Sequence, residues 1–94
     1  MTVNGSWANE EAVLNGEAPK IEFEIESTDK IKSIELLRNS VVIEHIKADE
    51  IYHFKGSTKD EDYSPSNGSQ YYYLRITQEN DHIGWSSPVW VRQA

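Results

Sequence analysis

The stretch KIEFEIES, at residues 20–27, alternates apolar and acidic side chains without interruption. The odd-numbered positions are apolar, namely Ile21, Phe23 and Ile25, and the even-numbered positions between and after them are glutamates. Successive side chains of a β-strand point to opposite faces, so this period of two predicts a strand with one buried and one wet face. A helix is excluded here because its period of about 3.6 would scatter the three apolar residues around its surface.

The next segment, residues 32–48, predicts a β-hairpin. Two apolar runs flank Arg38-Asn39-Ser40, a short polar break of the kind that forms a turn. Ile34 and Leu36 share a face in the first arm, whereas the second arm carries apolar residues on both faces. The inward register of that second arm therefore stays open.

A helix over residues 30–37 is the alternative for the first arm. Ile31, Ile34 and Leu37 follow one another at a spacing of three, which fits one face of a helix. We favour the strand because the β-branched run at residues 41–43 follows immediately and has strong strand character.

A further short run covers residues 49–57, with Tyr52 and Phe54 on one face and Ile51 and His53 on the other. The chain then changes composition. Residues 56–70 are mostly Gly, Ser, Asp, Asn and Pro, and this composition predicts a long loop.

The last third of the chain predicts the strongest hairpin. YYYLRITQ, at residues 71–78, places Tyr72, Leu74 and Ile76 on one face. Residues 79–82 turn the chain, and residues 83–92 return with Pro88 as an edge or bulge. With a short upstream strand at residues 12–14, the pattern predicts an all-β, antiparallel sandwich of about seven strands.

Composition sets the limits of function. The 94 residues allow one domain, spanning residues 1–94. A net charge of −7 argues against a nucleic-acid partner and against docking on anionic lipid. The absence of cysteine excludes disulfides, thiolate metal sites and a cysteine nucleophile, while it leaves the compartment open. No apolar run is long enough to span a membrane, so we expect no membrane partner.

The final hairpin resembles immunoglobulin-like and fibronectin type III domains. Tyr72-x-Leu74-x-Ile76 is similar to their sixth strand, and Trp85-Ser86-Ser87-Pro88-Val89 is similar to their seventh. The resemblance implies an immunoglobulin-like sandwich and a "tyrosine corner", in which the hydroxyl of Tyr72 bonds to upstream backbone. The disulfide and the buried tryptophan of antibody domains are absent, which favours the fibronectin-like side.

A narrower resemblance covers roughly two thirds of the chain. IKSIELLRNSVVIEH, at residues 31–45, together with the closing hairpin at residues 71–91 resembles the C-terminal module of bacterial PHP-type (polymerase and histidinol phosphatase-like) metal-dependent hydrolases. Ser40 stands where a turn glycine is more usual. The resemblance implies an accessory domain that closes a larger enzyme, and it carries over no catalytic residue because no position here matches one.

Three histidines raise the question of a metal site. His45, His53 and His82 lack the local spacing that gathers ligands, although strand pairing could bring His45 and His53 to Asp49. The acidic run Asp60-Glu61-Asp62 resembles a calcium loop in composition. It fails the EF-hand template, because Pro65 takes the sixth place and Tyr71 the twelfth. We expect no metal and no cofactor, and a non-EF calcium site in this loop stays open.

Nucleophilic catalysis has little support. Ser86-Ser87 and His82 form the nearest serine–histidine pair in the sequence, without a G-x-S-x-G or S-x-x-K motif. We therefore expect no enzymatic activity.

The aromatic residues carry the main functional hypothesis. If Tyr72, Leu74 and Ile76 face the core, Tyr71 and Tyr73 face outward, beside Trp85 or Trp90 on the partner strand. Such a strip suits a protein or domain interface, or stacking against sugar rings. The remaining interpretation is internal packing beneath Trp7 and the N-terminal segment. We expect a non-catalytic interaction domain, excised from a larger chain, that docks on a protein domain, with carbohydrate binding as the alternative.

Overall fold

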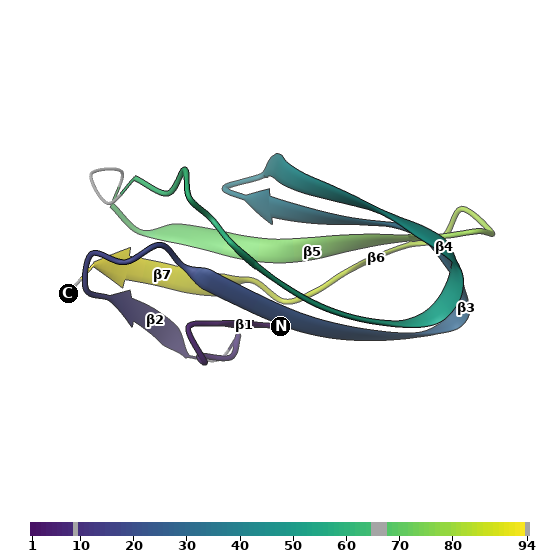
Figure 1. Cartoon of the computed structure of the whole chain (residues 1–94), viewed down its shortest axis with the longest axis horizontal. Helices are drawn as coiled ribbons and strands as arrows, with labels where there is room; N and C mark the ends of the chain where they lie inside the picture. Colours follow the sequence, from purple (N-terminus) through teal and green to yellow (C-terminus); the bar gives the residue numbers. More distant parts are fainter. Residues whose placement is uncertain (9, 65–67, 94) are drawn as a thin grey trace.

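The computed structural model describes residues 1–8, 10–64 and 68–93, with backbone only at 49, 50 and 93. In this part of the chain seven strands form one sheet without any helix (Figure 1): β1 (Thr2–Val3), β2 (Glu11–Leu14), β3 (Lys20–Arg38), β4 (Val41–Lys59), β5 (Gln70–Gln78), β6 (Ile83–Trp85) and β7 (Val89–Gln93). The all-β prediction is confirmed, and the helix considered for residues 30–37 is a strand. A membrane-crossing helix is likewise absent from the described residues.

The long hairpin of β3 and β4 dominates the fold. It reverses at Asn39 and Ser40, both of which have positive φ angles, of 50° and 69°. Two consecutive left-handed residues are what a two-residue type I′ turn requires, and that turn matches the twist of the flanking strands. The predicted turn is therefore confirmed, with Ser40 occupying a position at which glycine is easier.

Both long strands bend near their middle, so that the hairpin folds over itself into two layers (Figure 1). The register between them shifts between Glu26 and Ile31. We call β1, residues 20–26 of β3 and residues 53–59 of β4 the first layer. The second layer contains residues 31–38 of β3, residues 41–47 of β4, and strands β5, β6, β7 and β2. Strands that the sequence predicted as separate are joined through the bends.

Strand pairing in the second layer follows the order β4, β3, β5, β7, β2, with β6 also on β5. Every pairing in the sheet is antiparallel except β2 with β7, which is parallel. The expected bulge at Pro88 is an interruption of the last strand, because β6 ends at Trp85 and β7 begins at Val89.

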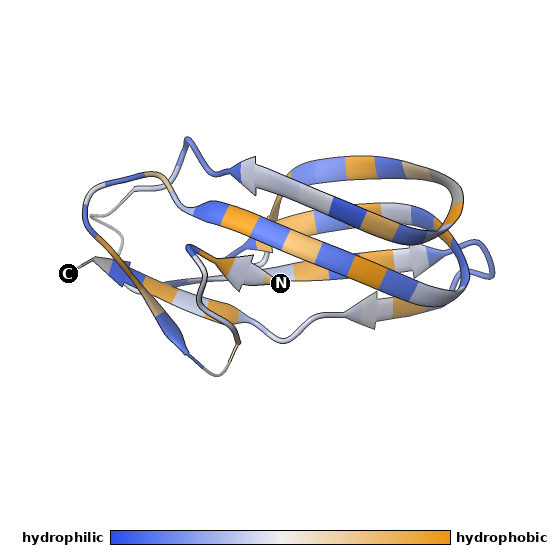
Figure 2. Cartoon of the chain, turned by 60° about the horizontal axis from the view of Figure 1, so that its bottom comes forward, coloured by the Kyte–Doolittle hydropathy of each residue, from blue (hydrophilic) through white to orange (hydrophobic). Residues whose placement is uncertain are grey.

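The core lies between the layers. Ile21 is fully buried, Phe23 nearly so, and the alternating glutamates of the first half of β3 are exposed, as predicted. The strands carry alternating hydrophobic and hydrophilic bands in Figure 2. Tyr72 and Leu74 are also buried. Each fully buried apolar side chain of this size contributes about 1.5–3 kcal/mol. The cluster consists of Val3, Ala12, Leu14, Ile21, Phe23, Ile31, Ile34, Leu36, Ala48, Tyr72, Leu74, Val89 and Val91.

Two predictions around β4 are wrong. The strand continues through Lys59, so the loop that was expected from residue 56 starts at Asp60. Ile51 packs against the core, whereas Tyr52 is exposed, so the faces assigned to residues 51–54 do not hold. The wrong faces follow from the bend and register shift of β4, which break a strict period of two. The loop starts late because residues 56–59 pair regularly with β3 in spite of their loop-like composition.

A buried polar cluster ties the two layers together. The hydroxyl of Tyr72 donates a 2.5 Å hydrogen bond to the carboxylate of Asp60, which also accepts a hydrogen bond from the Arg38 guanidinium. Burial and the bond to Asp60 raise the pKa of the Tyr72 hydroxyl, so it remains a donor. The bond from the Tyr72 hydroxyl to upstream backbone, which the resemblance implied, is therefore wrong: the acceptor is the Asp60 side chain.

Candidate functional site

The outer face of the second layer gathers three of the four predicted aromatic residues. Tyr71 lies opposite Trp90, and their ring centroids are 4.9 Å apart with a tilt of 47°. Tyr71 also stacks on Tyr73, with centroids 6.0 Å apart. The Asn39–Ser40 turn holds Tyr71 in place, because the Ser40 and Tyr71 hydroxyls are hydrogen-bonded at 2.8 Å. These three rings form one fixed group.

Trp85 lies on the same face at the next strand. It stands opposite Arg75, whose side chain shares the outward parity of Tyr71 and Tyr73. Its side chain is the most exposed of the group, at 63%, compared with 45% for Trp90. Cross-strand neighbours of this kind lie about 5 Å apart at Cβ, so Arg75 links Trp85 to the ring group.

Sequence reasoning missed the aliphatic part of this surface. Leu37 lies opposite both Tyr73 and Val42, which places it on the outer face, and its neighbours bury it there. Val42 is exposed beside it, and Ile83 is exposed near Trp85. The signal was available: Leu36 and Leu37 are consecutive, so one of them had to face outward once the other joined the core. We call the outer surface formed by Leu37, Val42, Tyr71, Tyr73, Arg75, Ile83, Trp85 and Trp90 the aromatic face.

One ion pair crosses the aromatic face. The Arg75 guanidinium donates a 2.8 Å hydrogen bond to the carboxylate of Glu35, which lies opposite it on β3. This hydrogen bond lowers the pKa of Glu35 and raises that of Arg75, so both groups are charged at neutral pH. Other polar groups lie on the same outer face, because His45 is opposite Glu35 and the Glu11–Arg92 ion pair is beside Trp90.

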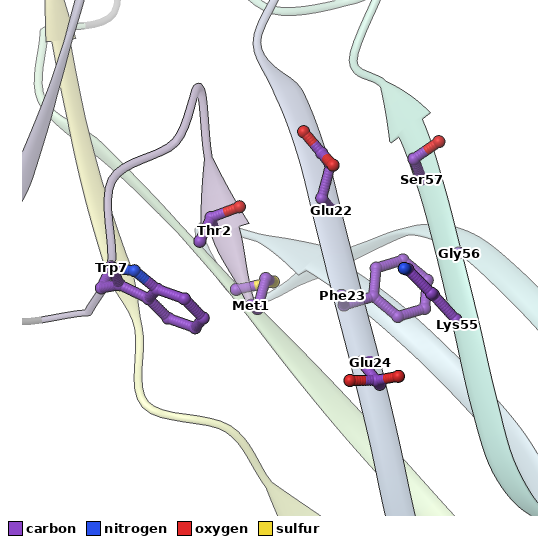
Figure 3. Close-up of a pocket in the computed structure, with 9 residues that line it drawn as sticks. All are labelled: Met1, Thr2, Trp7, Glu22, Phe23, Glu24, Lys55, Gly56 and Ser57. Atoms are coloured by element: carbon purple, nitrogen blue, oxygen red, sulfur yellow. The ribbon is translucent and has the colours of Figure 1, made fainter.

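Internal packing beneath Trp7 does not account for this face. Trp7 instead lines an open concavity of about 570 Å³ with residues of the first layer, including Glu22, Glu24 and Lys55 (Figure 3). Trp85 and Trp90 therefore remain exposed in the chain as described. Large apolar side chains gathered on one surface are typical of interaction sites in soluble proteins.

The histidines do not converge. His45 lies opposite Glu35, and His53 bonds to Glu24 at 2.8 Å on the other layer. His82 sits in the 79–82 turn beside Asn80. The side chain of Asp49 lies outside the described residues, and these contain no group of three metal-ligating side chains.

Asp60 of the acidic loop and Ser86 of the serine pair both have structural hydrogen bonds. Asp60 points inward, where its two oxygens accept bonds from Tyr72, Arg38 and the backbone N–H of Asp62. Of the other oxygen donors considered for calcium, Ser66 and Asn67 lie outside the described residues. The Ser86 hydroxyl accepts a 2.8 Å hydrogen bond from the backbone N–H of Leu74, away from His82 in the sheet register. It anchors the interrupted last strand to β5.

The comparisons with known proteins yield two bacterial relatives. An uncharacterised protein of Chlamydia trachomatis serovar D is 33% identical over 81 residues, an alignment that covers 71% of this chain and 12% of that protein. An uncharacterised protein of Chlamydia muridarum is 33% identical over 78 residues, with the same coverage. No protein-family model and no solved structure matches the chain. The chain thus spans about an eighth of the length of these relatives.

Proposed function

We propose that this chain is a non-catalytic accessory domain that docks through the aromatic face on another domain of a longer polypeptide. The observation that carries the proposal is the grouping of Tyr71, Tyr73 and Trp90 with the exposed Trp85 on one outer surface. Tyrosine, tryptophan and arginine are the residues most enriched at the centres of protein interfaces. The length of the Chlamydia relatives supports the presence of further domains beside a segment of this kind.

The strand order supports an immunoglobulin-like arrangement for this domain. Immunoglobulin-type domains place their first, second and fifth strands in one sheet, and the third, sixth and seventh in the other. The first layer here has β1, then the first half of β3, then the second half of β4. The second layer pairs the later half of β3 with β5, and β5 with β7. On this proposal each long strand serves as two strands of the sandwich.

The choice of partner rests on the resemblance to the C-terminal module of PHP-type hydrolases. We propose a catalytic metallohydrolase domain in the same polypeptide, with this domain covering or orienting it. All metal ligands and catalytic groups would belong to that partner.

A protein partner suits this face better than a sugar. Tyr71 and Tyr73 stack on each other at an interplanar angle of 11°, so each covers part of the other's flat surface. Trp90 tilts against the same pair. A sugar ring needs an uncovered aromatic plane, whereas a packed group of rings fits the pocket of a protein partner.

Two experiments test the proposal. The complete reading frame that contains this sequence is expected to encode a catalytic domain with metal ligands, and a frame without any second domain would overturn the proposal. The 94-residue chain is then titrated calorimetrically with the remainder of the polypeptide, produced separately. We expect saturable binding that Trp85→Ser with Trp90→Ser weakens strongly and Trp7→Ser leaves unchanged. Equal binding by both variants would contradict docking through the aromatic face.

A further inference from the structure

We infer that the concavity beside Trp7 is a second, separate binding site, and that it takes a neutral oligosaccharide. The site lies on the first layer, outside the aromatic face, and it does not depend on the proposed docking (Figure 3). The inference rests on an uncovered indole whose backbone is held by hydrogen bonds, on the shape of the surface beside it, and on the polar groups that surround that surface.

The backbone around Trp7 is held firmly. Asn4 and Gly5 both have positive φ angles and form a tight turn between Val3 and Ser6. The Asn4 side chain accepts a 2.7 Å hydrogen bond from the backbone N–H of Lys20, which fixes the turn to β3. Beyond the turn, the N–H of Trp7 donates to the Glu10 carboxylate at 3.1 Å, and its carbonyl accepts from the N–H of Glu10 at 2.9 Å.

The indole of Trp7 is nevertheless uncovered. Its side chain is 59% exposed, and no other aromatic ring of the described chain stacks on it. An exposed tryptophan whose backbone is fixed offers a flat apolar surface at little entropic cost on binding. This arrangement differs from that of Tyr71 and Tyr73, which cover each other.

The concavity beside the indole is lined by residues of β1, β3 and β4, with the paired, inward-facing positions Phe23 and Gly56 between the outward-facing side chains. Phe23 turns into the core, and Gly56 lies directly opposite it on β4. A Cβ at Gly56 would stand 2.8 Å from the Phe54 ring, so the core rings require glycine there. The concavity of about 570 Å³ falls within the range of pockets that bind small molecules.

Polar groups border this floor on both strands. Glu22 lies opposite Ser57, and Glu24 lies opposite Lys55. The Glu24 carboxylate is oriented by its 2.8 Å bond to His53. Together they present carboxylate acceptors, an ammonium donor and a hydroxyl, within the same concavity as an apolar plane.

These groups select among ligand classes. A sugar ring has an apolar C–H face that stacks on an indole and a rim of hydroxyls that bond to carboxylates and ammonium groups. An anionic sugar would be repelled by Glu22 and Glu24 and by the net charge of −7. A cationic ligand would meet Lys55. A neutral oligosaccharide satisfies all of these groups, and the open shape leaves room for a chain longer than the site.

The test follows the indole N–H signals of the 94-residue chain by ¹H–¹⁵N NMR during titrations. The probes are cellotriose, maltotriose and chitotriose, with trigalacturonate as the acidic counterpart and a lysine-rich peptide as the cationic one. We expect at least one neutral probe to shift the Trp7 signal saturably, with a dissociation constant of about 1 mM or tighter. The Trp85 and Trp90 signals should stay in place, and trigalacturonate should have no effect.

Variants separate binding from folding. Trp7→Ala should weaken the affinity for the active probe at least about tenfold, and Glu22→Gln should weaken it less. Trp85→Ala, a matched loss of an exposed indole on the other layer, should leave the affinity unchanged. The inference is overturned if no neutral probe shifts Trp7, if only the peptide does, or if Trp7→Ala binds normally while its amide spectrum shows the native fold. Each of these results leaves docking through the aromatic face untouched.

Discussion

The two halves of β3 belong to different layers and carry different outer surfaces. In the first half, Glu22, Glu24 and Glu26 all face solvent. In the second half the outward positions include Leu37, which is buried under Tyr73 and Val42. The outer face of the first half is therefore acidic, whereas that of the second half combines the apolar Leu37 with the carboxylate of Glu35, which is paired with Arg75. An outer face that contacts only water can be covered by charged side chains. Aromatic and aliphatic side chains gathered on an outer face indicate contact with another molecule or domain.

The largest effect on stability should come from the group that joins the layers. Asp60→Ala leaves the Arg38 guanidinium and the buried Tyr72 hydroxyl without their shared acceptor. We expect a loss of about 3 kcal/mol in the free energy of unfolding, because breaking a buried pair leaves the remaining groups uncompensated. Urea unfolding measures it. Glu61→Ala removes the neighbouring exposed carboxylate and should cost less than about 0.5 kcal/mol. Equal midpoints for the two variants would show that Asp60 does not link the layers.

A substitution that overpacks the core should destabilise the first layer. Gly56→Ala places a methyl group 2.8 Å from the Phe54 ring and 3.1 Å from the Phe23 ring. We expect a loss of about 1–3 kcal/mol from overpacking. Gly84→Ala, at a position with nothing within 4 Å of the new Cβ, is the matched control on the second layer. A smaller thermal shift for Gly56→Ala than for Gly84→Ala would argue against the packing of the two phenylalanines.

Acid should distinguish the ion pairs of the two surfaces. The Arg75 bond lowers the pKa of Glu35 in the folded state, so the pair stabilises the fold above the unfolded pKa of this carboxyl. That contribution is lost as the pH falls through the lowered folded pKa. Stability of the native chain should thus fall in acid more steeply than that of Glu35→Gln.

The matched variant on the first layer is Glu24→Gln, which removes the exposed partner of His53. The bond to His53 also lowers the pKa of Glu24, but solvent screens this more exposed pair. The acid limb of the Glu24→Gln curve should therefore lie closer to the native one than that of Glu35→Gln does. Urea midpoints across acidic pH measure both variants. Identical curves for Glu35→Gln and the native chain would contradict a stabilising pair on the aromatic face.

The smallest effect on stability is expected from the most exposed residue of the aromatic face. Trp85→Ser should change the free energy of unfolding by less than about 0.5 kcal/mol, because the side chain is largely in water. The same substitution should reduce the binding of an apolar fluorescent dye to the folded chain. A large loss of stability would mean that Trp85 is a core residue. It would contradict the interpretation of the aromatic face as an interface.

Much of the fold could be predicted from the sequence because the relevant signals are local. The period of two at Ile21, Phe23 and Ile25, the turn at Asn39 and the inward parity of Tyr72 and Leu74 each depend on a few neighbouring residues. The bends of β3 and β4 could not be predicted, since a bend that joins two layers in one strand leaves no break in composition. The faces of Ile51 and Tyr52 were assigned wrongly for that reason.

The candidate site was predictable in part. Once Tyr72 is placed in the core, the alternation of side chains along a strand predicts the outward direction of Tyr71 and Tyr73. It also predicts that Trp85 or Trp90 lies beside them on the partner strand. Local parity shows that Leu36 or Leu37 faces outward, but placing Val42 beside Leu37 depends on cross-strand register, which shifts between Leu36 and Leu37. The inward turn of Asp60 is a long-range effect of the same kind, because its partners Arg38 and Tyr72 lie on strands of the second layer.

The most direct test of the central claim is to compare the reactivity of the tryptophans in two contexts. Hydroxyl-radical footprinting is carried out on the 94-residue chain and on the polypeptide encoded by the complete reading frame, with mass-spectrometric readout at each tryptophan. Docking through the aromatic face predicts that Trp85 and Trp90 become several-fold less reactive in the longer polypeptide, while Trp7 on the first layer remains reactive. Equal reactivity of Trp85 and Trp90 in both contexts would contradict the claim.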